Sequence, residues 1–202
     1  SEGLIMCAWL IPVSDLTPDQ QRAVELPWDE HRLIYGAPGS GKTMILMHRA
    51  DYLRRNYKIP QNKYKIFVFT NMLKNYIKSA LYLLNIPDDS VTTFDSWCRN
   101  YYENNVSRSV PRMEGSSMPD FGAIREGTLD HMRRTGNARG FYDFVLADEA
   151  QDLNETALHI MRHISRHLTL CMDNKQQLYD TGSNLDAVLR VLNLRRVNQT
   201  LL

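Results

Sequence analysis

The sequence has few cysteines and no long apolar run, and each shortage argues against a class of protein. Its three cysteines, Cys7, Cys98 and Cys171, lie far apart and form no C-x-x-C pair. This spacing argues against a disulfide framework and against a zinc site. The apolar run 4–13 is too short to span a bilayer and is interrupted by Pro12. We therefore expect a cytoplasmic protein that does not enter a membrane.

Net charge is also nearly absent, since the formal charge is +1 and the pI is near 7.7. Any contact with a nucleic acid would therefore have to use a local surface. The chain has 202 residues, of which 43% are hydrophobic and 23% are charged, as in globular proteins. This length suits one domain over residues 1–202. Because the chain begins with Ser1 rather than Met, we expect it to be part of a longer protein.

The most informative pattern is LIYGAPGSGKT at residues 33–43. A short apolar stretch ends at Gly36, and four residues later come Gly41, Lys42 and Thr43, which is the P-loop spacing. Glycines let consecutive N–H groups face one anion, the lysine reaches the β- and γ-phosphates, and the Thr43 hydroxyl binds Mg²⁺. A glycine-rich surface turn is the alternative. The predicted ATP-binding residues of this loop are Gly36, Ala37, Pro38, Gly39, Ser40, Gly41, Lys42 and Thr43.

The segments on both sides of this loop have the signals of helices. From Met44 onward, apolar residues recur at spacings of three and four. Ahead of the loop, Thr17 can cap a helix whose first residue is Pro18. Gln20 lies in this earlier helix, and its amide can both donate to and accept from a purine edge. Gln20 is thus a candidate adenine contact, with an ordinary helix-surface glutamine as the alternative.

Strand and helix patterns alternate along the rest of the chain. Apolar runs predict strands at 65–70, 91–94, 144–147 and 168–172, and amphipathic spacing predicts helices at 71–85, 95–103, 154–167 and 185–192. This alternation is typical of a three-layer α/β fold with a mostly parallel central sheet.

Residues 104–140 interrupt the alternation. The segment is polar, contains six arginines against four acids, and carries Pro111 and Pro119. We interpret it as an insertion in which 124–134 forms a short helix. It could contact a polyanion, or it could be a solvated loop with paired charges.

The strand predicted at 144–147 ends on Asp148 and Glu149. Ligands bind at the carboxyl ends of the strands in open α/β sheets. Asp148 could therefore hold Mg²⁺, and Glu149 could orient and deprotonate an attacking water. Gln176, just after the next strand, could sense the γ-phosphate. These residues, with Lys42, form the predicted catalytic set.

Three histidines follow this acidic pair at a regular interval. In the helix predicted at 154–167, His159, His163 and His167 recur every four residues and would share one face. The alternatives are a metal-binding stripe and a solvated face, and no acid or cysteine accompanies the three histidines on that face.

Taken together, these motifs resemble those of the first RecA-like domain of UvrD/Rep-type superfamily 1 helicases. The matching segments are LTPDQQRAV, GAPGSGKT, VFTN, TTFDSW, LADEAQD and CMDNKQQLY, in the order of that family. They extend from Leu16 to about Tyr179. The resemblance implies ATP-driven translocation along single-stranded nucleic acid, which we expect to be DNA.

The resemblance also implies a role for individual residues. Gln20 would contact adenine, and Gln176 would couple the γ-phosphate to the nucleic-acid groove. The candidate contacts with the strand are Phe69, Asn71, Phe94 and Tyr179. Aromatic rings stack on any base, and this indifference to sequence suits a translocase.

Some family features are missing from the sequence. Met44 stands where the family usually has an arginine, and Thr181 where it has an aromatic residue. The family's Asn-Tyr-Arg would fall on 197–199, so its tyrosine and arginine are not in register. A second RecA-like domain, which closes over ATP in a helicase, is also absent from residues 1–202. These departures leave open an ATP-binding switch with little or no hydrolysis and, less favoured, a phosphotransferase.

Overall fold

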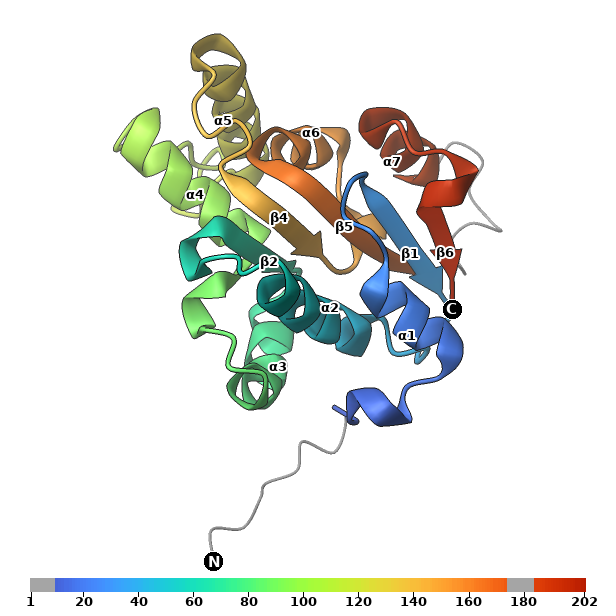
Figure 1. Cartoon of the computed structure of the whole chain (residues 1–202). Coiled ribbons are helices and arrows are strands. Elements are labelled where there is room, and N and C mark those ends of the chain that lie inside the picture. The colour runs from blue at the N-terminus through green and yellow to red at the C-terminus, as the bar shows by residue number, and fades with distance from the viewer. Residues whose placement is uncertain (1–9, 174–183) are drawn as a thin grey trace, which may run out of the picture.

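The computed structural model describes residues 10–173 and 184–202, in which a six-stranded sheet lies between two layers of helices (Figure 1). The strand order is β3-β2-β4-β5-β1-β6, and all pairings among these strands are parallel. The strands are β1 (Arg32–Gly36), β2 (Tyr64–Val68), β3 (Val91–Thr93), β4 (Tyr142–Ala147), β5 (Ser165–Asp173) and β6 (Gln199–Leu201). The predicted parallel α/β architecture is confirmed.

Two helical layers cover the two faces of the sheet. One layer consists of α1 (Pro18–Glu25), α2 (Lys42–Asn56) and α3 (Asn71–Leu83). The other consists of α4 (Phe94–Asn105), α5 (Phe121–Thr135), α6 (Glu155–Ile164) and α7 (Asn184–Leu192). No helix among the described residues is long and apolar enough to cross a membrane.

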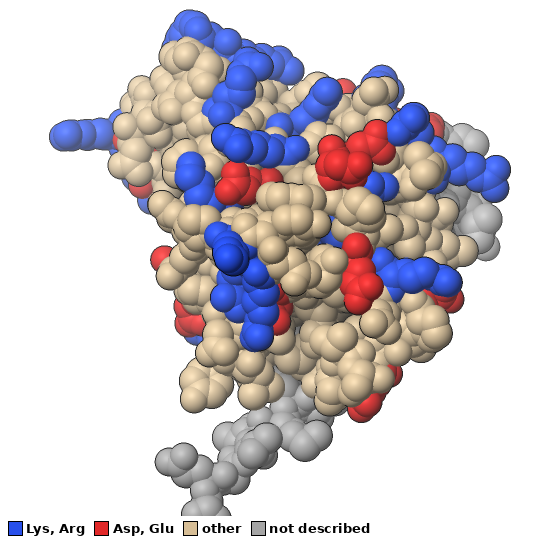
Figure 2. Space-filling model, viewed as in Figure 1, with Lys and Arg blue, Asp and Glu red and all other residues tan. Residues whose placement is uncertain are grey.

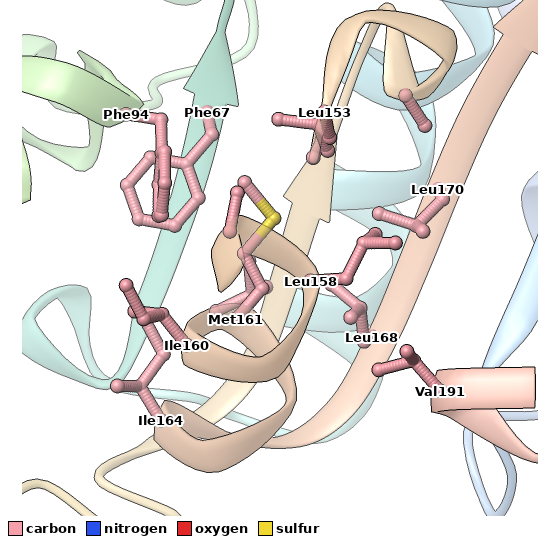
Figure 3. Close-up of a cluster of buried hydrophobic side chains, with 14 of the residues drawn as sticks. Phe67, Phe94, Leu153, Leu158, Ile160, Met161, Ile164, Leu168, Leu170 and Val191 are labelled. Atoms are coloured by element: carbon pink, nitrogen blue, oxygen red, sulfur yellow. The ribbon is translucent and has the colours of Figure 1, made fainter. Parts of the chain in front are cut away.

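The strands supply side chains alternately to two hydrophobic cores, because successive residues of a strand face opposite sides of the sheet. In β4, Phe144 and Leu146 pack under α1–α3, whereas Val145 and Ala147 pack under α4–α7. Figure 3 shows the second core, in which side chains of α6 point toward the strands. Burial on both faces explains why the strands read as continuous apolar runs.

Short polar side chains fix where several helices begin. Thr17 accepts a hydrogen bond from the Gln20 backbone, and the Gln20 side chain accepts one from the Thr17 backbone, which completes a capping box at α1. Thr93 caps α4 through a single bond, in which its hydroxyl accepts from the Ser96 backbone N–H. Phe94 is consequently the first residue of α4 and not, as predicted, the last residue of a strand.

The predicted histidine stripe is wrong, because His167 does not lie on a helix. α6 ends at Ile164, and β5 begins at Ser165 and includes His167, which pairs with Phe144 of β4. The apolar spacing in this region fits a helix, but pairing with β4 extends the strand. The described residues contain no group of three or more His, Cys, Asp or Glu side chains able to hold a metal ion.

Part of the polar segment 104–140 packs into the protein. The helix predicted at 124–134 is confirmed as α5, and its Ile124 and Met132 side chains are fully buried against the second core. Arg125 of α5 forms an ion pair with Asp95 of α4. A single antiparallel bridge between Arg112 and Pro119 shapes the connection between the two helices.

The distribution of charge follows the direction of the helices. α2, α5, α6 and α7 each precede a strand, so they end at the amino edge of the parallel sheet. All four carry arginine in the last turn, where a cation stabilises the helix dipole. Figure 2 shows Lys and Arg along the upper rim of the molecule, over α5 and toward α7. The helix dipole therefore accounts for the last-turn arginines of α2, α5, α6 and α7 without a ligand.

Candidate functional site

The P-loop connects β1 to α2 at the carboxyl edge of the sheet. Gly39 and Gly41 have φ angles of +81° and +88°, in the left-handed region that favours glycine. Gly41 is the N-cap of α2, and its carbonyl accepts the first helical hydrogen bond from Ile45 at 2.9 Å. The loop therefore directs backbone N–H groups and the positive end of α2 toward one point.

The first two residues of α2 carry the polar side chains of the loop. Lys42 Nζ donates to the carbonyl oxygens of Gly36 and Ala37, at 2.9 Å each, and so arches over the loop. The Thr43 hydroxyl donates to Asp148 Oδ2 at 2.5 Å. This contact joins the loop after β1 to the end of β4, across 105 residues of sequence.

Asp148 is a buried carboxyl group, with 4% of its surface exposed. Burial raises the pKa of Asp148, while hydrogen bonds from Thr43 and from the Glu149 N–H, together with the charge of Lys42, oppose this rise. A cation bound here would favour the ionised carboxylate.

Glu149 has an unusual backbone conformation and a carboxyl group with a shifted pKa. Its φ of +52° is unusual for a residue other than glycine, and such outliers occur at functional sites. Burial and then the nearby charge of Asp148 raise the pKa of Glu149. A raised pKa increases the basicity of the carboxylate, as a group that accepts a proton requires.

These side chains surround one cavity of about 570 Å³, a size typical of small-molecule sites. The predicted residues that line it are Gln20, Pro38, Gly39, Gly41, Lys42, Thr43, Asp148 and Glu149. Gly36, Ala37 and Ser40 contribute through their carbonyls, which hold Lys42 and Gln20 in place. Gln20 Nε2 donates to the Ser40 carbonyl at 3.2 Å, so the capping glutamine also contacts the loop.

The cavity also has four lining residues that the sequence did not predict as ligand contacts. They are Ile11, Met44, Tyr76 and Asp173. Asp173 ends β5 beside the end of β1. An acid at the end of a strand is the sequence signal that could have identified Asp173 as a cavity residue. Ile11 and Tyr76 come from segments that only the tertiary structure brings to the loop.

A second, apolar groove of about 430 Å³ adjoins the cavity. Its lining residues are Phe69, Thr70, Met72, Leu73, Tyr76, Glu149 and Asp152. Tyr76 and Glu149 line both spaces and therefore form their common wall. Phe69 is 44% exposed, and Asn71 is exposed at the start of α3.

Three predicted site residues remain, and the structure describes one of them, Phe94. Phe94 is 5% exposed and packs edge-on against Phe67, which argues against contact between its ring and a nucleic acid. Gln176 and Tyr179 lie outside the described residues.

The arginines near the end of the chain lie at the opposite edge of the sheet from the cavity. Arg195 forms an ion pair with Glu30, just before β1, and Asn198 donates to the same carboxylate at 2.7 Å. Gln199, the first residue of β6, pairs with Leu33, which is about 10 Å from Gly36 at about 3.3 Å per residue. Arg195 and Arg196, which precede β6, therefore lie toward the edge of the sheet opposite the P-loop.

The residues of the cavity fit a magnesium nucleotide. A cation would find the Thr43 hydroxyl and the buried Asp148 carboxylate together, and oxygen ligands of this kind suit Mg²⁺. An added Cβ at Gly41 would meet Met44 Cε at 3.1 Å and Gln20 Nε2 at 3.2 Å, so the loop needs glycine to keep its form.

Comparison with known families and proteins gives a consistent result. The model of the UvrD/REP helicase N-terminal domain family matches residues 16–133. A probable DNA helicase II homolog of Mycoplasma capricolum is 33% identical over 89 residues, which are 42% of this chain and 12% of that protein. The ATP-dependent DNA helicase SRS2 of Saccharomyces cerevisiae is 30% identical over 96 residues, 45% of this chain and 8% of SRS2. The matches thus span a small part of these relatives.

Solved structures show the same fold at low sequence identity. The Pif1 helicase of Candida albicans superposes with a TM-score of 0.53 and 13% identity, over 93% of this chain and 39% of that one. The Hef helicase domain of Pyrococcus furiosus gives a TM-score of 0.53 and 13% identity, over 91% and 37%. At this identity, the two structures support the RecA-like fold alone.

Proposed function

Because the chain belongs to the family of UvrD/REP helicase N-terminal domains, we propose that it is the ATP-binding core of a superfamily 1 DNA helicase or translocase. The observation that carries the proposal is the contact between Thr43 and Asp148. It brings the phosphate-binding loop and the acidic pair after β4 to one cavity, as ATP hydrolysis requires.

In this proposal the loop holds the phosphates of ATP and Gln20 holds the adenine. Lys42 lies beside the phosphates, and its ammonium group would exchange the carbonyls of Gly36 and Ala37 for phosphate oxygens. Mg²⁺, held by Thr43 and Asp148, would neutralise charge on the β- and γ-phosphates. The Glu149 carboxylate would orient the attacking water and accept its proton.

The apolar groove beside the cavity supports a nucleic-acid partner. We propose that single-stranded DNA lies along this groove, with Phe69 stacking on a base and Asn71 bonding to the strand. Gln176 and Tyr179 keep their proposed roles in sensing the γ-phosphate and in stacking. The common wall of Tyr76 and Glu149 offers a route by which the strand could influence hydrolysis. A second RecA-like domain would close the nucleotide site.

An ATP-binding switch with little hydrolysis is the second candidate. One observation favours it: among the described residues, no arginine lines the cavity. The helicase and the switch would bind ATP at the same site and would differ in the rate at which they hydrolyse it.

Calorimetry with ATP and Mg²⁺ tests the shared part of the proposal. We expect Lys42→Ala to weaken binding by more than about tenfold, because the phosphates lose the cation of the loop. Arg55→Ala is the matched control, because it removes a cation from the other end of the same helix, where Arg55 pairs with Asp51. Equal affinity in wild type and Lys42→Ala would exclude the site.

Fluorescence anisotropy with a labelled oligonucleotide tests the groove. We expect Phe69→Ala to weaken single-strand binding by about 1–3 kcal/mol, the value of one stacked aromatic ring. Tyr82→Ala is the control, because Tyr82 is 84% exposed near the far end of α3 and lies outside the groove. Similar losses in both variants would refute a specific role for Phe69.

A further inference from the structure

Gln151 is a buried amide beside the proposed catalytic acids, and nothing in the sequence assigns it a role. It is 7% exposed and lies in the short 3-10 helix Ala150–Asp152, which follows Glu149. Burying an amide is unfavourable unless its donor and its acceptor are both satisfied. The partners of Gln151 therefore indicate what the side chain does.

The two ends of the Gln151 side chain bind two different strand ends. Its Nε2 donates to Glu149 Oε2, and its Oε1 accepts from the Asp173 backbone N–H at 3.1 Å. Glu149 follows β4, Asp173 ends β5, and both residues line the nucleotide cavity. One amide thus connects the proposed base to the adjacent strand end.

The partners also determine the orientation of the amide. A backbone N–H can only donate, so the group facing Asp173 must be the oxygen of Gln151. The NH₂ group then faces the Glu149 carboxylate, which accepts. A glutamate at position 151 would keep the acceptor for Asp173 but would place a carboxylate against Glu149.

The main chain of Glu149 is fixed by other contacts. Its N–H donates to Asp148 Oδ1 at 3.0 Å, and its carbonyl accepts from the Asp152 N–H at 3.0 Å. The backbone is therefore held, but the Glu149 side chain can still rotate about its own bonds. The hydrogen bond from Gln151 restrains the carboxylate itself.

We propose that Gln151 is a positioning residue, which holds the Glu149 carboxylate in the nucleotide cavity and ties its position to the end of β5. The proposal rests on the proposed function, since it assigns Glu149 as the base. A hydrogen bond to Oε2 leaves the lone pairs of Oε1 to accept a proton from water. Movement of the β5 end would move the carboxylate with it.

ATPase assays with radiolabelled ATP on the 202-residue chain, with single-stranded DNA, resolve its slow turnover and test the positioning role. We expect Gln151→Met and Gln151→Glu each to lower kcat by about tenfold or more, while KM for ATP stays within about threefold. Gln151→Glu is the informative variant, because it retains the acceptor for Asp173, removes the donor to Glu149 and places a second carboxylate against that residue.

Asn198→Leu is the matched control for a merely structural role. Asn198 is also a buried amide that joins two segments, since it accepts from the Arg195 N–H and donates to Glu30. It lies at the opposite edge of the sheet, so its loss should lower the melting temperature without changing kcat. A change in kcat for the Gln151 variants no larger than for Asn198→Leu would overturn the proposal.

A second measurement is independent of turnover and separates this inference from the proposed function. In NMR spectra of the chain, Glu149→Gln should shift the amide resonance of Asp173, because Gln151 transmits the change. The same substitution in a Gln151→Met background should leave that resonance in place. An equal shift with and without Gln151 would refute the connection, whereas failure to bind ATP would refute the proposed function alone.

Discussion

At the scale of single residues, the site depends on backbone positions that only some side chains tolerate. Gly41 and Gly39 both lie in the left-handed region, but their surroundings differ. A Cβ at Gly41 would meet Met44 and Gln20, whereas a Cβ at Gly39 would meet nothing within 4 Å. Comparing alanine substitutions at the two positions therefore distinguishes the effect of backbone strain, which both share, from the effect of steric crowding, which only Gly41 has.

We expect Gly41→Ala to impair the loop more than Gly39→Ala. Both should lose about 1–2 kcal/mol from left-handed strain, and Gly41→Ala should lose more because its methyl group crowds Gln20 and Met44. Urea unfolding and ATP calorimetry on the two variants check this. If the two variants had equal stability and equal affinity for ATP, the crowding around a methyl group at position 41 would have no energetic effect, and the prediction would be wrong.

The carboxylate of Glu149 gives a second prediction at this scale. Glu149→Gln should keep the affinity for ATP and Mg²⁺ within about threefold and should remove turnover, because Asp148 and Thr43, the proposed metal ligands, are unchanged. Calorimetry and single-turnover hydrolysis of labelled ATP measure the two effects. Undiminished hydrolysis in this variant would assign the base to another residue.

At the scale of elements, a buried arginine joins α2 to α1 and β5. Arg49 is fully buried and donates to the carbonyls of Val24 and Leu26, and also to Thr169 and His167. These carbonyls belong to the last turn and C-cap of α1, where a cation is favourable. The helix that carries Gln20 is thus held by the helix that begins at the P-loop.

His167 makes this contact sensitive to pH. Burial, followed by the charge of Arg49, lowers the pKa of His167 well below its ordinary value of 6.5. The unfolded chain therefore binds a proton below about pH 6.5 that the folded chain excludes. The free energy of unfolding should fall by about 1.4 kcal/mol for each pH unit below 6.5, until the folded pKa is reached.

Urea unfolding at pH 7.5 and 5.5 checks this sign. The loss of stability on acidification should be smaller by about 1 kcal/mol in His167→Gln, whose amide can still accept from Arg49. His163→Gln is the control, because His163 is a partly exposed histidine on α6. An identical pH dependence in wild type and His167→Gln would contradict the assigned pKa direction.

At the scale of the whole molecule, the described structure forms one wall of the proposed nucleotide site. The P-loop, Asp148 and Glu149 line it, whereas Arg195 and Arg196 lie at the start of the 3-10 helix that precedes β6, toward the other edge of the sheet. An arginine finger contributes about 10³–10⁵ in the rate of phosphoryl transfer. The described part of the chain therefore offers groups for binding ATP but places no arginine finger in the cavity.

We accordingly expect the isolated 202-residue chain to bind ATP and Mg²⁺ with a Kd on the order of 100 µM, to hydrolyse ATP very slowly and to leave duplex DNA intact. Steady-state assays with and without single-stranded DNA, together with an unwinding assay, measure these properties. Strand-stimulated turnover on the order of 1 s⁻¹ would show that an arginine of this chain reaches the phosphate. The switch alternative would then be excluded.

The sequence by itself determined the features that depend on neighbouring residues. The spacing of Gly36, Gly41 and Lys42 predicted the loop, Thr17 and Pro18 predicted the start of α1, and the alternation of apolar runs predicted a parallel sheet. These features follow from local backbone preferences and hydrophobic periodicity, which short segments carry without help from the rest of the chain.

The tertiary structure decided the features that depend on pairing between distant segments. Strand pairing with β4 placed His167 on β5, helix packing buried Phe94, and the register of β6 directed Arg195 away from the P-loop. The Gln151 amide found its partners only because β4 and β5 end side by side. The periodicity of a short segment cannot predict such contacts, because each contact joins segments that lie far apart in the sequence and meet only in the folded sheet.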